Sequence, residues 1–130
     1  MPLTREMMGM IKAIKFVSVY VSDQDAALAF YTQKLGFTVV TDQPMGPDAR
    51  WIELRIPGAE TGLVLAKPFQ PENIVGAFMN MAFVADDVQR TYDELSARGV
   101  QFRQPPKTEP WGTSAIFTDP DGNSFVISTK

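Results

Sequence analysis

The order of predicted secondary-structure elements occurs twice along the chain, and this repetition limits the possible folds more than any other feature. In the first half, the β-branched and aromatic run 15–21 predicts a strand, Asp23 is placed to cap the helix that follows, and Gly36 is placed to end it. Three more predicted strands complete that half. The second half repeats the order, with Asp87 lying 64 residues after Asp23 and Gly99 lying 63 residues after Gly36. The pattern therefore predicts an internal duplication.

Residue periodicity locates the individual elements. Alternation is clearest in 50–56, where Ile52 and Leu54 point to one side and Trp51 and Glu53 point to the other. The predicted elements are strands at 15–21, 37–41, 50–56, 62–66, 79–85, 100–103, 113–118 and 124–128, helices from 24 to 35 and from Asp87 to Gly99, and loops at 42–49 and 105–112.

We expect one domain of the α+β class. A chain of 130 residues fits a single domain, and its 45% hydrophobic content supports a packed core. The expected parts are a first βαβββ unit at 12–67, a linker at 68–78 and a second βαβββ unit at 79–128. One unit of about 60 residues leaves a face of its sheet bare and is marginally stable alone. Two units placed edge to edge would form a curved mixed sheet around a cleft, where a small molecule is expected to bind.

Charge and two missing residue types exclude several classes of function. Twelve basic and fifteen acidic residues give a net charge of −3, so we expect no nucleic-acid partner and no membrane partner. The sequence contains neither a membrane-spanning apolar run nor a signal-peptide pattern. It has no cysteine and no histidine, which excludes disulfides, thiolate nucleophiles and a Ser-His-Asp triad. The lack of cysteine is consistent with the cytoplasm, where we expect the protein.

Three segments carry a more specific pattern. They are FVSVYVSDQDAALAFYTQKLGF at 16–37, AFVADDVQRTYDELSARGVQF at 82–102 and FTDPDGNSFVIS at 117–128. These segments resemble the vicinal oxygen chelate superfamily, which groups glyoxalase I, extradiol dioxygenases, fosfomycin resistance proteins and bleomycin-binding proteins. The resemblance covers about residues 12–128 and implies the paired βαβββ fold and a homodimer. It does not specify an activity.

The resemblance also identifies the positions that hold a metal ion in metal-dependent members. There, His or Glu side chains on cleft-facing strand positions bind the ion, and by motif these positions are Phe16, Val64, Asn80 and Val126 in this sequence. Phenylalanine and valine offer no donor atom, and Asn80 offers one neutral amide oxygen. The resemblance therefore implies that the metal site is lost, and we expect no metal and no other cofactor.

Strand alternation places a set of side chains on the cleft face. The expected ligand-binding residues among them are Phe16, Ser18, Tyr20, Trp51, Glu53, Arg55, Asn80 and Val126, and the same alternation adds Ala82, Ser124 and Ser128. Trp111, in the predicted loop before the seventh strand, is also expected to bind the ligand, from close to the rim of the cleft. Aromatic rings suit a flat organic ligand, and Glu53 with Arg55 can hold a charged or hydrogen-bonding substituent. Each group also has a structural alternative. The tryptophans can cover a sheet edge or a dimer contact, and Glu53 and Arg55 can form a solvated pair.

These observations favour a metal-free binding protein for an aromatic, antibiotic-like small molecule, with no catalytic residue. The alternative is a glyoxalase-like or dioxygenase-like enzyme. It would be metal-independent, with Glu53 as acid and base, or it would use a metal held by unusual ligands. A third possibility is a partner-dependent module whose cleft is filled by side chains. Fold alone does not decide among these functions.

Overall fold

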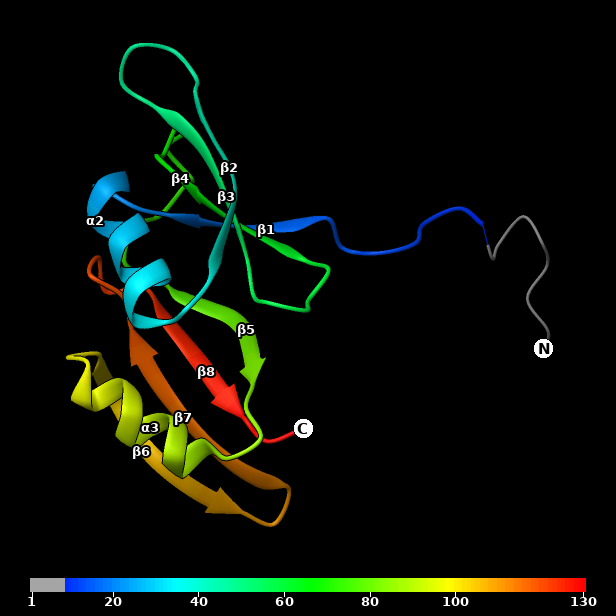
Figure 1. Ribbon diagram of the computed structural model, residues 1–130, viewed down its shortest axis with the longest axis vertical. Coiled ribbons are helices and arrows are strands. Elements are labelled where there is room, and N and C mark those ends of the chain that lie inside the picture. The colour runs from blue at the N-terminus through cyan, green and yellow to red at the C-terminus, as the bar shows by residue number, and fades with distance from the viewer. Residues whose placement is uncertain (1–8) are drawn as a thin grey trace.

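The computed structural model describes residues 9–130 (Figure 1). In chain order, the elements are β1 (Phe16–Tyr20), α2 (Gln24–Ala29), the π-helix η1 (Phe30–Lys34), β2 (Thr38–Pro44), β3 (Arg50–Arg55), β4 (Gly62–Ala66), β5 (Phe78–Val84), α3 (Val88–Ala97), β6 (Gln101–Glu109), β7 (Gly112–Thr118) and β8 (Ser124–Ser128). The predicted order of elements therefore occurs twice. Within these described residues, no helix is long and apolar enough to cross a membrane.

Each repeat forms its own four-stranded mixed sheet. The strand orders are β1-β4-β3-β2 and β5-β8-β7-β6. In each sheet the first strand of the unit pairs in parallel with the last, and the other neighbours are antiparallel. The helices α2 and α3 lie on the same side of the molecule, each beside the sheet of its own unit (Figure 1). The predicted α+β class with two βαβββ units is confirmed.

The buried side chains alternate along the strands as the sequence predicts. Val19 in β1 and Ile52, Leu54 in β3 are fully buried on the helix side of the first sheet. Phe125 in β8 occupies the matching side of the second sheet. Burying a large apolar side chain of this kind contributes about 1.5–3 kcal/mol to folding.

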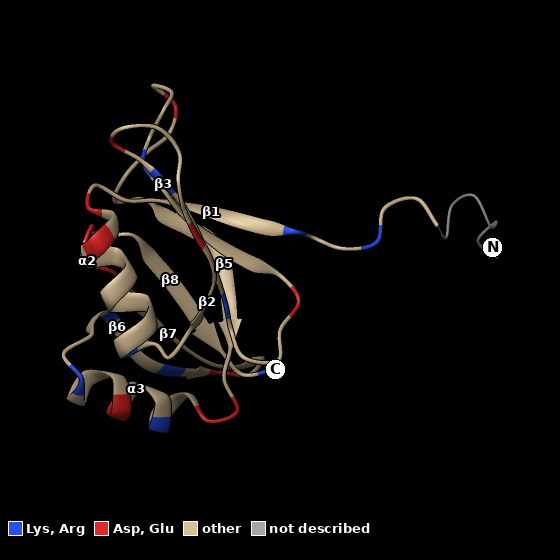
Figure 2. Cartoon of the chain, turned by 45° about the horizontal axis from the view of Figure 1, so that its top comes forward, with Lys and Arg blue, Asp and Glu red and all other residues tan. Residues whose placement is uncertain are grey.

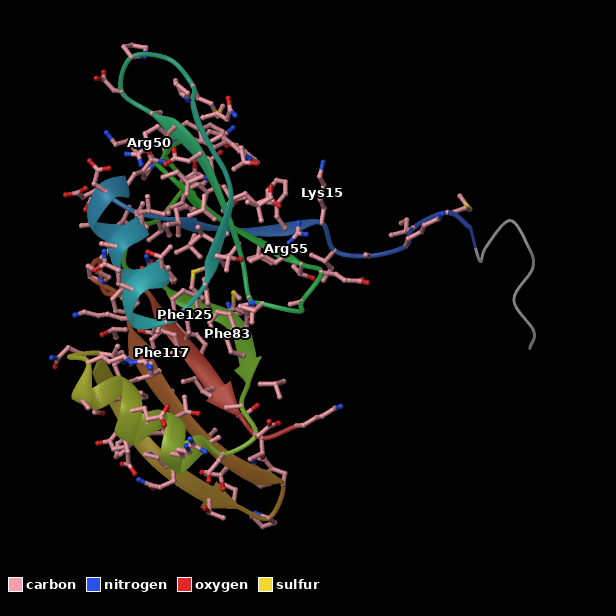
Figure 3. The ribbon with its side chains drawn as sticks, viewed as in Figure 1. Lys15, Arg50, Arg55, Phe83, Phe117 and Phe125 are labelled. Carbon is pink, nitrogen blue, oxygen red and sulfur yellow. The ribbon has the colours of Figure 1, made fainter. Side chains whose placement is uncertain are left out.

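The hydrophobic core continues from one unit into the other. The ring of Tyr31 lies 6.2 Å from Phe125, and the ring of Phe37 lies 5.8 Å from Phe83. Phe117 stacks on Phe125 at a ring distance of 5.3 Å. Figure 3 shows Phe83, Phe117 and Phe125 close together where the two units meet. The two repeats therefore share one core.

The tight turn before β8 joins the units through hydrogen bonds. The hydroxyl of Tyr31 donates to Asp119 Oδ2 at 2.8 Å. Asn123 is fully buried, its Nδ2 donates to the carbonyl of Tyr20 at 3.0 Å, and its Oδ1 accepts the N–H of Gly76 at 2.8 Å. Because buried polar groups need partners, this turn acts as a connector between distant parts of the chain.

The structure corrects the predicted boundaries of two outer strands. The sequence predicts a loop at 105–112, but β6 continues through Glu109. Because β6 is the outer strand of its sheet, a proline in it can face the open edge without removing a hydrogen bond of the ladder. The pairing of β6 with β7 also shifts in register between Gln104 and Lys107. In the same way β2, the outer strand of the first sheet, extends to Pro44. Proline is a poor guide to strand ends at a sheet edge.

The first helix also differs from its predicted form. Asp23 caps it as expected, with its side chain accepting a backbone N–H at 3.0 Å. The second half is the π-helix η1, in which the N–H of Leu35 donates to the carbonyl of Phe30 at 3.3 Å. A π-turn holds one more residue than an α-turn. In this wider turn the consecutive rings of Phe30 and Tyr31 are both buried.

Candidate functional site

The candidate site lies on the face of the first sheet opposite the buried side, which we call the bare face. Alternation along the strands places Phe16, Ser18, Tyr20, Trp51, Glu53, Arg55 and Val64 on it. Figure 3 shows Arg55 on the side of the sheet away from α2, while Arg50, at the start of β3, points toward α2. The carboxylates of Asp25 in α2 and Asp42 in β2 hold the Arg50 guanidinium there.

Two aromatic rings meet over the middle of the bare face. Phe16 in β1 and Trp51 in β3 contact each other edge to face, with ring centroids 5.3 Å apart and planes at 85°. The strand β4 lies between them, and its Val64 is only 1% exposed. Phe16 and Trp51 are themselves half-buried, so part of each ring remains accessible. Such a surface can stack against a flat organic molecule.

Charged groups lie beside these rings. Arg55 Nη2 is 3.3 Å from Glu53 Oε2, and the Glu53 side chain is 12% exposed. The Nε of Arg55 is buried and has no hydrogen-bond partner among the described residues. A guanidinium with a single long contact retains donors for a further acceptor. The predicted pairing of Glu53 with Arg55 is therefore present, but it leaves the arginine incompletely satisfied.

Gly62 is a site residue that the sequence analysis did not identify. It lies in β4 opposite Arg55, and a Cβ at this position would be 2.5 Å from Glu53 Oε2. The absence of a side chain therefore makes room for the Glu53 carboxylate. A glycine inside a predicted strand is the sequence signal for such a close approach.

Phe69 is a second residue without a predicted role. Its ring lies 6.5 Å from the ring of Tyr20, although it belongs to the expected linker. It is largely exposed. The only sequence signal is an aromatic residue between Pro68 and Pro71 in a segment otherwise expected to be polar.

The other predicted residues belong to the second sheet. Asn80 lies in β5 and Val126 lies in β8, where it is opposite Ala82. In the part of the chain that the structure describes, no backbone ladder joins the strands of this sheet to those of the first. A cleft lined by Asn80 and Val126 together with Trp51 stays a prediction.

Trp111 lies apart from the bare face. It sits in the turn between β6 and β7 and is 83% exposed. That turn is at the opposite end of the molecule from β3 (Figure 1). Within a single chain Trp111 therefore lies apart from Trp51, and its place at the rim of a shared cleft stays a prediction. Trp51 alone of the two tryptophans belongs to the first sheet.

The residues present do not fit a metal ion at the superfamily positions. Val64 lies opposite Ser18 and Glu53, and Val126 occupies the equivalent place in β8. Neither valine has a donor atom, and neither does Phe16. Among residues 9–130, no three acidic side chains are close enough to share a cation. The described part of the chain therefore offers no ligand set from which a metal-dependent step could be derived.

Two adjoining hollows lie where the units meet, and we call them together the seam groove. Their volumes are about 410 Å³ and 310 Å³. Both are lined by Phe37, Ile56, Phe83 and Val84. Ile56 and Val84 are exposed apolar side chains at the ends of their strands. This groove is formed by segments distant in the sequence, so no local pattern of residues predicts it.

A third hollow is polar and lies near the start of α2. It has a volume of about 560 Å³ and is lined in part by Asp25, Arg50 and Lys67. The hydrogen bond from Arg50 holds the pKa of Asp42 below its ordinary value. The hydrogen bond with Asp42, and to a lesser extent the one with Asp25, raise the pKa of the Arg50 guanidinium above its ordinary value. Arg50, Asp25 and Asp42 satisfy one another, which indicates a structural role for this group of three.

Comparison with known proteins agrees with this geometry. Residues 13–127 match the family model of the Glyoxalase/Bleomycin resistance protein/Dioxygenase superfamily. The uncharacterized protein YetH of Bacillus subtilis (strain 168) is 40% identical over 118 residues, which cover 91% of this chain and 98% of that protein.

Solved structures share the fold. A member of the same superfamily from Sphaerobacter thermophilus superimposes with a TM-score of 0.85 at 33% identity, covering 92% of this chain and 98% of that one. TnmS3, an antibiotic binding protein from Streptomyces sp. CB03234, superimposes with a TM-score of 0.83 at 38% identity, covering 92% of this chain and 96% of that one. The chain therefore belongs to the Glyoxalase/Bleomycin resistance protein/Dioxygenase superfamily.

Proposed function

We propose that this protein binds an aromatic, antibiotic-like small molecule on the bare face, without a metal and without catalysis. One observation carries the proposal: the Phe16–Trp51 ring pair and the Glu53–Arg55 charge pair lie on the same face of one sheet. The rings supply a stacking surface, and the charged groups supply orientation. Sequestering an antibiotic in this way would confer resistance.

The similarity to TnmS3 supports this class of ligand. That protein is described as an antibiotic binding protein, and it shares 38% identity and the fold with this chain. Because one fold hosts many functions, the proposal depends mainly on the side chains of the bare face.

Arg55 is the expected polar contact. The Arg55 side chain is 38% exposed, and among the described residues its guanidinium has one contact, at 3.3 Å to Glu53, which leaves Nη donors for an acceptor oxygen on the ligand. A hydrogen bond to a charged group is worth about 1.5–3 kcal/mol. Arg55→Gln should therefore weaken binding by roughly tenfold to a hundredfold.

A fluorescence titration tests the proposal. In a Trp111→Phe variant, Trp51 is the remaining tryptophan and should be quenched saturably by at least one compound of an aromatic antibiotic panel that includes doxorubicin. The matched Trp51→Phe variant lacks the ring that supplies the stacking surface and should bind the same compound several-fold more weakly by calorimetry. Calorimetry on the same variants and compounds controls for the loss of fluorescence that occurs when a coloured compound absorbs the light itself. If neither method detects saturable binding of any compound, the proposal is wrong.

A second candidate function follows from the burial of Glu53. Its carboxylate is mostly buried and faces the same surface, which is the placement that an acid–base group needs. A metal-independent enzyme would isomerise a thiohemiacetal after chelator treatment, because that reaction only moves a proton from one carbon to the next and needs no oxidant. Glu53→Gln would abolish that turnover.

We further propose that the protein works as a homodimer in the cytoplasm, with a single domain made of the units 12–67 and 79–128. Asn80 and Val126 belong to a different sheet from Trp51, and Trp111 lies in the turn between β6 and β7, so a partner subunit is a simple means of bringing them to a shared ligand. The cysteine-free sequence is consistent with the cytoplasm. We propose neither a nucleic-acid partner nor a membrane partner.

A further inference from the structure

Three neighbouring strands bring an aromatic ring and two basic residues to one end of the bare face. In the register of the first sheet, Phe16 in β1 and Arg55 in β3 both lie opposite Gly62 of β4. Lys15 precedes Phe16, and its carbonyl accepts the N–H of Gly62 at 2.9 Å. Figure 3 shows Lys15 and Arg55 at the same end of this sheet, away from α2.

The spacing of the strands lets both basic side chains reach one bound group. Since β1 and β3 each lie next to β4, their backbones are about 10 Å apart, which is twice the usual distance between paired strands. Lysine and arginine have long, flexible side chains that can converge above β4 from either side. The ring of Phe16 lies in the same row of the sheet as Arg55, so a stacked ligand would have its nearest substituent beside the guanidinium.

The positive charges at this end are accessible, while the negative charge of the bare face is mostly covered. The Arg55 side chain is 38% exposed and the Glu53 side chain is 12% exposed. Lys15 is exposed and has no ion-pair partner among residues 9–130. Figure 2 shows a basic residue at the start of β1 and another near the end of β3. The surface that a ligand meets there is therefore basic.

Gly62 explains why the Glu53 carboxylate lies low against the sheet. A Cβ at position 62 would be 2.5 Å from Glu53 Oε2 and 3.1 Å from Glu53 Cγ. Because Gly62 has no side chain, Glu53 can lie across β4 and contact Arg55 Nη2 at 3.3 Å. This single contact uses one donor of the guanidinium, and the remaining Nη donors can bind a second anionic oxygen.

We infer that the ligand of the bare face is an aromatic acid, whose anionic oxygen group binds Arg55 and Lys15 while its ring stacks on Phe16 and Trp51. The inference rests on the proposed function and adds the charge class of the ligand. Two accessible cations and one covered carboxylate leave an excess of positive charge beside the rings, which an anion neutralises. An amine of the same shape would meet like charges.

Calorimetry with two matched probes tests the charge of the ligand. Anthraquinone-2-carboxylate and the neutral anthraquinone-2-carboxamide share one ring system and differ in charge at a single substituent. The protein should bind the carboxylate at least about tenfold more tightly, because hydrogen bonds between charged groups are stronger than those to a neutral amide. The preference should shrink in about 0.5 M sodium chloride, since salt screens exposed charges.

This comparison also separates the inference from the proposed function. Equal affinity for the two probes, or tighter binding of the carboxamide, would overturn the aromatic acid and leave small-molecule binding in place. The same holds if the carboxylate shows no saturable binding while a neutral or cationic compound of the antibiotic panel binds. If no compound of any charge binds, both the inference and the proposed function are wrong.

Charge-removing variants assign the preference to named side chains. Arg55→Gln should weaken carboxylate binding about tenfold or more, and Lys15→Gln about threefold to tenfold, with carboxamide binding changed by less than about threefold in each. Lys67→Gln removes the same charge just beyond the opposite end of β4 and should change neither affinity by more than about twofold. Unchanged carboxylate affinity in Arg55→Gln or Lys15→Gln, or an equal loss in Lys67→Gln, would overturn the assignment.

Glu53→Gln should have an effect of the opposite sign. The substitution removes the charge that competes for Arg55, so the carboxylate should bind several-fold more tightly while the carboxamide changes little. Weaker carboxylate binding would mean that Glu53 itself holds the ligand, against the inference. Circular dichroism and urea unfolding establish that each variant folds.

Discussion

Tyr31 shows how one side chain can couple the two units. It belongs to the first unit, its hydroxyl donates to Asp119 of the second, and its ring packs between Phe37 and Phe125. The side chain is fully buried, so a phenolate there would lack water and lie beside a carboxylate. Burial, and then the nearby charge of Asp119, therefore raise the pKa of Tyr31 far above its ordinary value of about 10.

This raised pKa predicts a loss of stability at high pH. Above about pH 10, Tyr31 loses its proton in the unfolded chain but keeps it in the folded one. Its contribution to stability is complete below that pH and is lost as the pH rises toward the folded-state pKa, with a slope of up to about 1.4 kcal/mol per pH unit. Urea unfolding between about pH 8 and pH 11 should show a steeper decline for the wild type than for Tyr31→Phe. Equal slopes would contradict this account.

An aspartate caps the N-terminus of each α-helix. Asp87 precedes α3, and its side chain accepts the N–H of Arg90 at 3.0 Å. The carbonyl of Asp87 also accepts the hydroxyl of Thr91 at 2.9 Å. Because the first N–H groups of a helix have no partners within it, this contact should stabilise the whole element.

Removing the cap should lower the free energy of unfolding by about 1 kcal/mol in Asp87→Ala. Asp87→Asn keeps an acceptor oxygen and should retain most of the stability. Chemical denaturation followed by circular dichroism gives both values. If Asp87→Asn and Asp87→Ala lose the same amount, the hydrogen bond is not the source of the stabilisation.

Local sequence signals predicted the position of most elements well, but they misplaced the ends of strands that lie at the edge of a sheet. The predicted bounds of β4 and β8 match those observed, because both are short apolar strands between clear turns. The strand β6 continues through Pro105 and Pro106, where the sequence predicts a loop. A proline disrupts a strand only if its missing N–H is needed, and that depends on the position of the strand in the sheet.

At the scale of the whole molecule, the shared core should make the two units unfold together. The rings of Tyr31 and Phe37 contact rings of the second unit, and Asn123 bridges to the end of β1. Neither unit can lose its fold without exposing side chains of the other. A single cooperative transition is expected.

A destabilising substitution in one unit should therefore also lower the stability of the other unit. In a Trp111→Phe background, Phe125→Leu in β8 should shift the urea midpoint of the Trp51 signal in β3, by an amount equivalent to about 1 kcal/mol. The midpoint from circular dichroism should shift equally. A Trp51 transition that does not move, or that separates from the circular dichroism transition, would show independent units.

The sequence by itself determined the order of the elements, the side of each strand that is apolar and the absence of donor atoms at Phe16, Val64 and Val126. These properties depend on residue type and on neighbours a few positions away. The pairing of Glu53 with Arg55 was also predictable, because residues two apart on a strand share a face.

Only the tertiary structure decided which of these residues meet. Phe16 contacts Trp51 because β1 and β3 flank β4 in one sheet, so that their rings can meet above it. Gly62 of β4, which has no side chain, makes room for the Glu53 carboxylate. Trp111 is separated from them because its turn lies at the far end of the second sheet. Strand order and the packing of distant segments set these distances, and no local periodicity in the sequence encodes them.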